Sequence, residues 1–183
     1  MASVLVPLAQ GCEELEAVTV VDLLRRGGIE VITAGLDAQP VRASRGMLLV
    51  ADTTLDTALQ QEFDMVVLPG GLPGADHLRD DPRVIELVKK MAANDRYTAA
   101  ICAAPRVLAH AGLLDGKRAT SYPGALDINA VPDIDYQELP VVTDGKVITS
   151  RGPGTAMDFA LTLIETLAGR HKRDEVEAGL QRV

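Results

Sequence analysis

The sequence predicts an α/β fold in which a mostly parallel sheet is covered by helices on both faces. Two observations support this prediction. Short apolar runs typical of buried strands alternate with longer segments of helical periodicity along the 183 residues. No linker, internal repeat or low-complexity block interrupts the alternation. We therefore expect residues 1–183 to form a single domain, because the chain has the usual length of one.

The first half of the chain predicts strands separated by one long helix. The apolar run Ser3–Leu8 predicts a strand, and the segment Glu13–Arg26 predicts a helix that Gly27-Gly28 ends. Four apolar residues of this helix recur at the spacing of one face. They are Ala17, Val20, Val21 and Leu24. Further strands are expected at Ile29–Ala34 and Asp64–Leu68, with one or two short strands within Val41–Ala51.

The second half continues the alternation and ends in helices. Asp81-Pro82 begins a predicted helix that reaches Ala93, because proline is favoured in a first helical turn. Thr155 and Asp158 resemble a capping box at the start of a later helix. The other expected elements are a strand at Thr98–Ile101, a helix ending at His110, a hairpin at Val141–Ile148 around Asp144-Gly145, a helix at Thr155–Leu167 and a polar helical tail at Arg170–Val183.

Composition and charge exclude several classes of function. Hydrophobic residues make up 47% of the chain and charged residues 24%, which is typical of a globular protein and not of a disordered one. The formal net charge of −8 disfavours a nucleic-acid or anionic-membrane surface, which needs a basic footprint. The absence of Trp, with three Tyr and two Phe, disfavours stacking platforms for bases.

The cysteines and histidines indicate neither a disulfide framework nor a metal site. Cys12 and Cys102 are the two cysteines of the chain, and we expect both to be thiols in a reducing compartment. The N-terminus lacks a signal-peptide pattern and no apolar stretch is long enough to span a membrane, so a cytoplasmic protein is expected. The histidines, none of them at metal-ligand spacing, are His77 in a polar loop, His110 and His171. No cofactor is expected.

Three strand ends carry residues that could do chemistry, because ligands bind at the carboxyl ends of strands in open α/β sheets. Glu13, Glu14 and Glu16 follow the first strand, where acidic residues also complement a helix dipole. Glu16 fits that surface role less well, since an apolar run follows it. Gly70-Gly71 follows another strand, where exposed N–H groups could bind an oxyanion or form a tight turn only.

Cys102 ends the third of these strands and has the strongest case. A residue at a strand-to-helix turn presents its side chain outward, as in a nucleophile elbow, and the helix N-terminus that follows lowers a thiol pKa. An inert core cysteine remains the alternative. Cys12 lies near the same sheet edge, either as a resolving thiol for Cys102 or as a small filler.

Taken together, these segments resemble the ThiJ/PfpI superfamily, in the branch of bacterial YajL and the human parkinsonism-linked protein deglycase. The resemblance covers essentially the whole chain. The segments that carry it are Gly11-Cys12-Glu13-Glu14-Leu15-Glu16, Val21-Asp22-Leu23-Leu24-Arg25-Arg26-Gly27-Gly28, Val67-Leu68-Pro69-Gly70-Gly71, Ala99-Ala100-Ile101-Cys102-Ala103-Ala104-Pro105 and Thr149-Ser150-Arg151-Gly152-Pro153-Gly154-Thr155.

The resemblance implies a flavodoxin-like three-layer α/β/α sandwich that forms a homodimer. It implies that Cys102 is the reactive cysteine and that Glu16 is a carboxylic acid hydrogen-bonded to its thiolate. Backbone donors of the family's pocket fall on Gly70, Gly71 and Ala103. Activities attributed to the family are glutathione-independent hydration of methylglyoxal and glyoxal and removal of their protein adducts, as a lyase or hydrolase. Stress sensing and chaperone roles are attributed to it as well.

The chain departs from the family at one position of the pocket. Many members carry a histidine where this sequence has Tyr122, and the protease-like members have histidine where it has Ala103. No Cys–His dyad can therefore be drawn, which argues against a peptidase. Two hypotheses remain. The first is an enzyme acting on small dicarbonyls or glycated proteins, and the second is a stress sensor or chaperone that uses oxidation of Cys102.

Overall fold

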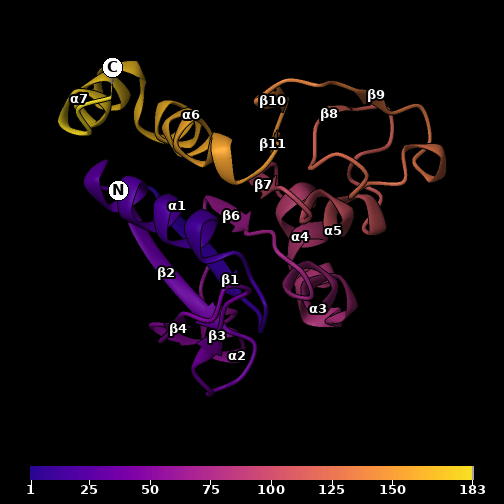
Figure 1. Ribbon diagram of the computed structural model, residues 1–183, viewed down its shortest axis with the longest axis horizontal. Helices are drawn as coiled ribbons and strands as arrows, with labels where there is room; N and C mark the ends of the chain where they lie inside the picture. Colours follow the sequence, from indigo (N-terminus) through magenta and orange to yellow (C-terminus); the bar gives the residue numbers. More distant parts are fainter. Residues whose placement is uncertain (183) are drawn as a thin grey trace.

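A seven-stranded sheet runs through the centre of the computed structural model, which describes residues 1–182, between two layers of helices (Figure 1). The strand order is β10-β11-β7-β6-β1-β2-β5. All neighbouring pairs are parallel except β10 and β11, which form an antiparallel hairpin at one edge. The strands are β1 (Ser3–Leu8), β2 (Glu30–Gly35), β5 (Thr53–Thr54), β6 (Met65–Leu68), β7 (Tyr97–Ile101), β10 (Val141–Asp144) and β11 (Val147–Ser150).

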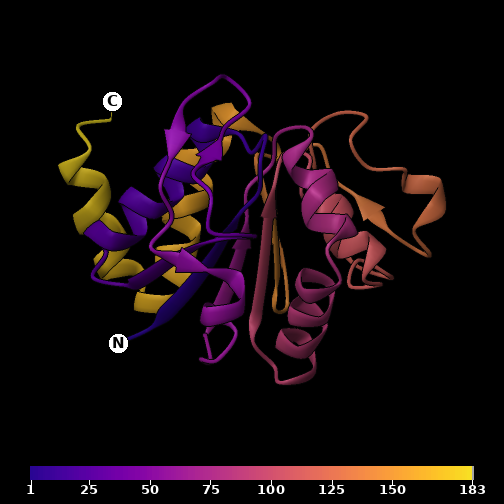
Figure 2. The ribbon, with the colours of Figure 1, turned by 90° about the horizontal axis from the view of Figure 1, so that it is seen from below.

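Helices cover both faces of this sheet, and Figure 2 shows the two layers on either side of it. Alternate residues of β1 enter different cores because successive strand side chains point to opposite faces. Val4 and Val6 pack with the first helical layer, and Leu5 packs with the second. The first layer is α1 (Glu14–Arg26) and α6 (Ala156–Ala168), with α7 (Arg170–Gly179) against α6; the second is α2 (Leu55–Ala58), α3 (Gly74–Asp80), α4 (Pro82–Ala93) and α5 (Pro105–His110).

Shorter strands and 3-10 helices lie in the segments that connect the main elements. An antiparallel pair, β3 (Val41–Arg42) and β4 (Leu48–Leu49), lies outside the main sheet, and so does the parallel pair β8 (Arg118–Ala119) and β9 (Asp135–Tyr136). Two 3-10 helices occupy Ile128–Ala130 and Pro153–Thr155. No helix among residues 1–182 combines the length and the apolar character needed to cross a membrane.

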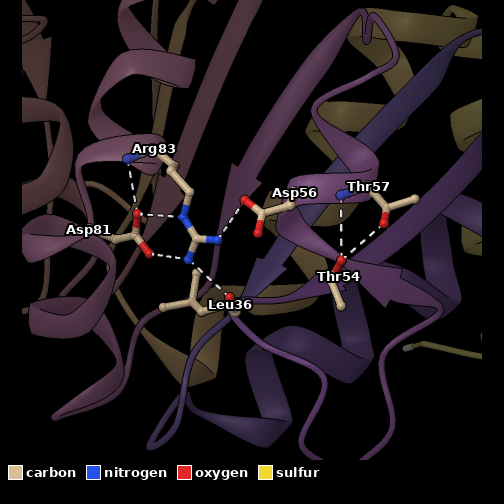
Figure 3. Close-up of polar contacts among 6 residues, drawn as sticks. All are labelled: Leu36, Thr54, Asp56, Thr57, Asp81 and Arg83. Atoms are coloured by element: carbon tan, nitrogen blue, oxygen red, sulfur yellow. Dashed lines mark hydrogen bonds and ion pairs between the residues drawn. The ribbon is translucent and has the colours of Figure 1, made fainter.

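Arg83 of α4 connects the second helical layer to the loop that follows β2 (Figure 3). Asp81 caps α4 by accepting the N–H of Arg83 at 2.9 Å. The Arg83 guanidinium also donates to Asp81 and reaches Asp56 of α2 at 2.8 Å and the carbonyl oxygen of Leu36 at 2.9 Å. The start of α4 is therefore joined to α2 and to the loop after β2.

The predicted fold class is confirmed, as are the long helices and the hairpin around Asp144-Gly145. Two local predictions were wrong. His77, expected in a loop, lies in α3. Thr155 does not form a capping box with Asp158, because its hydroxyl is used by Ser150 and Gly152. The predicted C-terminal helix ends at Gly179, and Val183 lies outside the described residues.

Candidate active site

Three loops that follow neighbouring strands bring the candidate residues to one edge of the sheet. Glu16 lies in the first turn of α1 after β1, Gly70-Gly71 follows β6, and Cys102 follows β7. Because β1, β6 and β7 are adjacent and parallel, their carboxyl ends meet. The residues singled out in the sequence are therefore neighbours in space.

Cys102 has the strained backbone expected of a nucleophile elbow. Its φ angle is +64°, in the left-handed region that non-glycine residues rarely adopt. Hydrogen bonds on both sides hold this conformation: the N–H of Cys102 donates to the carbonyl of Ser150 at 2.9 Å, and the N–H of Tyr122 donates to the carbonyl of Cys102 at 2.8 Å. The thiol is thus presented in one fixed direction.

In the first turn of α1 the charged side chain of Glu16 is buried and the apolar side chain of Leu15 is exposed. Glu16 is fully buried, whereas its neighbour Leu15 is 49% exposed. Oε2 of Glu16 accepts the N–H of Gly70 at 2.8 Å, and Oε1 is buried with no nitrogen or oxygen partner among residues 1–182. The carboxyl group lies close enough to the thiol of Cys102 for each group to shift the pKa of the other. Glu16 is therefore oriented toward the thiol by a backbone group.

Gly70 allows this close approach because it has no side chain. A Cβ atom at Gly70 would lie 2.6 Å from Cβ of Cys102, 2.7 Å from the carbonyl oxygen of Ile101 and 2.8 Å from Oε2 of Glu16. Gly71 has a φ angle of +85°, which favours glycine as well. The Gly-Gly pair lets the loop after β6 lie directly against the elbow.

Burial raises the pKa values of both ionisable groups. The pKa of Glu16 rises from 4.5 to about 7, mainly because its carboxyl group is desolvated. Desolvation, together with the neighbouring Glu16 carboxylate, raises the pKa of Cys102 to about 12. This differs from the lowering expected from a helix N-terminus, because burial and the facing carboxylate outweigh it. Between these values the Cys102–Glu16 pair holds one proton in total.

The backbone N–H groups of Gly71 and Ala103 lie near the thiol and favour its thiolate, which lowers the pKa of Cys102 in part. The N–H of Gly70 is already occupied by Glu16. This differs from the expectation that Gly70 and Gly71 both offer free N–H groups to a bound oxyanion. Gly70 instead orients the acid.

A family model described as the DJ-1/PfpI family matches residues 2–166. The chain belongs to this family. Protein dj-1beta of Drosophila melanogaster is 45% identical over 180 residues, which are 97% of this chain and 96% of that protein. A crystal structure of Drosophila melanogaster DJ-1beta matches with a TM-score of 0.94 and 43% identity, covering 100% of this chain and 98% of that chain. The fold is accordingly the flavodoxin-like α/β fold of DJ-1 proteins.

Two further relatives differ in length and name. Protein DJ-1 homolog A of Arabidopsis thaliana is 45% identical over 178 residues, which are 96% of this chain but 45% of that protein. The chain thus spans less than half the length of this plant relative. The protein named Glutathione-independent glyoxalase DJR-1.2 of Caenorhabditis elegans is 36% identical over 175 residues, covering 96% of this chain and 92% of that protein.

Tyr122 occupies the position at which the family resemblance led us to expect a histidine in many members. Its backbone is bonded to Cys102, and its ring packs against Gly152, where a Cβ atom would lie 3.3 Å from Cδ2 of Tyr122. The side chain is half exposed. It therefore borders the site without being enclosed in it.

The second cysteine and the histidines lie outside this arrangement. Cys12 is fully buried, and desolvation raises its pKa to about 12, with Glu14 and Glu13 adding to the effect. Its backbone is held by Ala9 and Ser44. Both cysteines are free and buried. The histidines are exposed and lie on helices: His77 on α3, His110 on α5 and His171 on α7.

One contributor to the site was not foreseen from the sequence. Ser150, at the end of β11, receives the N–H of Cys102 through its carbonyl group. The hairpin around Asp144-Gly145 was predicted from the sequence and contains β11. Its sequence does not indicate that β11 pairs with β7, which is what brings Ser150 next to Cys102. Among residues 1–182, no three His, Cys, Asp or Glu side chains gather closely enough to hold a metal ion.

Proposed function

We propose that this chain is a cysteine-dependent enzyme that converts methylglyoxal or glyoxal, or their adducts on proteins, without glutathione. The observation that carries the proposal is the pair of buried side chains at the elbow: the Cys102 thiol, and the Glu16 carboxyl group that the N–H of Gly70 holds at 2.8 Å. A carboxylate with a pKa of about 7 is well matched to proton transfer at neutral pH. The name of the nematode relative supports the same class of substrate.

The proposed reaction begins with an addition. The sulfur of Cys102 forms a bond to the aldehyde carbon of methylglyoxal while the thiol proton passes through Glu16 to the aldehyde oxygen. The product is a hemithioacetal. The N–H groups of Gly71 and Ala103, which lie near the sulfur, are the proposed donors to the negative charge that develops on this oxygen.

An internal rearrangement and a hydrolysis complete the cycle. Glu16 removes the proton from the former aldehyde carbon and returns a proton to the neighbouring carbon, so the first carbon is oxidised and the second reduced. The resulting thioester is cleaved by water, which releases lactate and restores the thiol. No external oxidant or reductant is needed. Cys102 and Glu16 are the proposed catalytic residues; Gly71, Ala103 and Tyr122 are proposed to contact substrate, and Gly70 to orient the acid.

A stress sensor or chaperone that uses oxidation of Cys102 is the second candidate. The same observation supports it, because a buried carboxyl group and two N–H donors would also stabilise an oxidised sulfur. The two functions differ in turnover. A sensor reacts once with peroxide, whereas an enzyme converts many substrate molecules.

Lactate formation from methylglyoxal by the purified protein tests the first proposal. We expect many turnovers per chain in the wild type and in Cys12→Ala, and none in Cys102→Ala. Cys12→Ala is the matched control because both variants remove one buried thiol. Absence of lactate in the wild type, with Cys102 shown to be reduced by mass spectrometry, would overturn the enzyme proposal.

We also propose that the chain forms a homodimer through α1 and the β3–β4 segment. Leu15 and Val18 of α1 are about half exposed, and Val50, just after β4, is 83% exposed. Val18, Leu49 and Val50 line one shallow cavity of about 280 Å³, so the apolar side chains of the two segments are neighbours. An apolar patch of this kind is typical of an interface between copies of a chain.

The proposed location is the cytoplasm. Its support is the pair of free cysteines, because thiols are kept reduced in that compartment.

A further inference from the structure

The residues after Tyr122 form a tight turn beside the candidate site. The N–H of Ala125 donates to the carbonyl of Tyr122 at 2.9 Å, which closes the four-residue turn. Pro123 stands at the second position, and Gly124 at the third has a φ angle of +77°. These are the residues and the angle of a type II turn. The turn is a rigid unit that carries the Tyr122 side chain.

Both ends of this turn are attached to the segment that begins at the elbow. The N–H of Tyr122 donates to the carbonyl of Cys102 at 2.8 Å. At the other end, Nη2 of Arg106 donates to the carbonyl of Ala125 at 3.0 Å. Cys102 and Arg106 are four residues apart, so one turn of chain supplies both attachments.

The same guanidinium group reaches the helix that follows the Gly-Gly loop. Nη1 of Arg106 donates to Oδ1 of Asp76 in α3 at 2.8 Å. The start of α3 is bonded to that loop, because the N–H of Ala75 donates to the carbonyl of Gly71 at 2.9 Å. The Arg106 side chain is only 21% exposed, so water competes little for these contacts.

We propose that Arg106 is a positioning residue that fixes the Tyr122 turn relative to the Cys102 elbow and the loop of Gly71. The proposal rests on the proposed function, in which Tyr122 borders the substrate. Arg106 acts through Ala125 and Asp76 and does not contact the reacting sulfur. Loosening it should therefore weaken substrate binding and leave the reactivity of the thiol unchanged.

Arg79 provides a matched control on the same carboxylate. Its Nη1 lies 3.0 Å from Oδ1 of Asp76, and its other ionic contact is the neighbouring Asp80. Arg79 has no hydrogen bond to the turn 122–125. Arg79→Leu and Arg106→Leu each remove one cation from Asp76, but only the second frees the turn.

The first measurement is backbone hydrogen exchange over residues 120–126, which requires no activity. We expect exchange in this segment to be about fivefold faster in Arg106→Leu and unchanged in Arg79→Leu. Arg106→Lys keeps the charge but loses the two-pronged geometry, so its exchange should be intermediate, and it serves if the leucine variant fails to fold. Wild-type exchange in both Arg106 variants, or an equal rise in Arg79→Leu, would overturn the proposal.

The second measurement is the kinetics with methylglyoxal. In Arg106→Leu we expect KM to rise about fivefold and kcat to stay within about twofold. In a Tyr122→Ala background the same substitution should have no further effect, because it acts through that turn. A fall in kcat alone, or additive effects, would contradict the proposal. If the wild type makes no lactate, the proposed function fails, while hydrogen exchange still decides the role of Arg106.

Discussion

The N–H group of Gly70 donates to Oε2 of Glu16 at 2.8 Å, although 54 residues separate the two in the sequence. This bond joins the end of β6 to the first turn of α1 and fixes the carboxyl group that faces Cys102. Backbone atoms are less mobile than side chains, so the orientation of the acid is set by the sheet itself. The following predictions test what this arrangement does.

Glu16→Gln should suppress the reactivity of Cys102 at neutral pH. Gln can still accept from Gly70 but cannot take the thiol proton, so the pair no longer loses a proton near pH 7. The thiol then titrates alone, at a pKa that desolvation still raises but to which the Glu16 carboxylate no longer contributes. We expect alkylation by iodoacetamide at pH 7 to slow by at least about tenfold, with the midpoint of the pH–rate profile moving above about 9. Cys102→Ser is the control for background labelling. An unchanged profile would remove Glu16 from the mechanism.

The same substitution should change how stability depends on pH. Glu16 has a pKa of about 7 when folded against 4.5 as the reference value, so the folded state binds more protons than the unfolded state between these pH values. Wild-type stability therefore falls as pH rises from about 4.5 to about 7, and Glu16→Gln lacks this loss. The free energy of unfolding of the variant minus that of the wild type, measured by chemical denaturation, should be up to about 3 kcal/mol larger at pH 8 than at pH 4.5. A difference in unfolding free energy that does not change with pH would contradict the raised pKa of Glu16.

Gly70→Ala should damage the site, and Gly154→Ala should not. The new methyl group at Gly70 would meet the backbone oxygen of Ile101 and Cβ of Cys102, neither of which can rotate away. Gly154 has no atom within 4 Å of an added Cβ. Denaturation should show a loss of about 1–3 kcal/mol for the first variant and under about 0.5 kcal/mol for the second. Similar stabilities for the two variants would refute the close packing.

Mild peroxide should add two oxygens to Cys102 and leave Cys12 reduced. The sulfinate at Cys102 gains hydrogen bonds from Glu16, Gly71 and Ala103, whereas Glu13 and Glu14 oppose a thiolate at Cys12. Peptide mass spectrometry on the wild type, Cys102→Ser and Cys12→Ser locates the modification. Loss of the modification in Cys12→Ser, or a Cys12–Cys102 disulfide, would favour a two-thiol switch instead.

Light scattering at micromolar concentration should give the mass of two chains. Val50→Asp places a charge within the exposed apolar patch and should yield a monomer. Leu139→Asp is the control, because Leu139 is equally apolar and 51% exposed but is not among the residues that line the patch cavity. A monomeric wild type would remove the homodimer proposal.

The spacing of apolar residues predicted the long helices and strands, because one buried face of such an element requires apolar residues at regular intervals. The predicted apolar face of α1 was nearly right, but the structure buries Leu23 and leaves Val21 half-buried. Along this shifted face Glu16 precedes Val20 by one helical turn, which explains why a charged residue is buried there. The two-residue strands β5, β8 and β9 were not foreseen, since so short a segment becomes a strand only through its partner.

The site was foreseen as a set of strand ends, and its hydrogen bonds were not. The sequence places Cys102, Glu16 and Gly70 at one sheet edge, but it cannot say which acceptor the Gly70 N–H chooses. Thr155 shows the same limit. Its local spacing suggested a cap, whereas a buried hydroxyl contact with Ser150 at 2.7 Å takes its side chain. Contacts between segments far apart in sequence decide these details.

The left-handed backbone at Cys102 suits glycine better than any residue with a side chain. A non-glycine residue there costs about 1–2 kcal/mol, which a glycine would recover. The most stable choice for the backbone at this position would therefore abolish the thiol. Selection for thermal stability alone would favour glycine over cysteine at this position. A stabilised variant that retains the thiol therefore retains the free-energy cost of this backbone conformation as well.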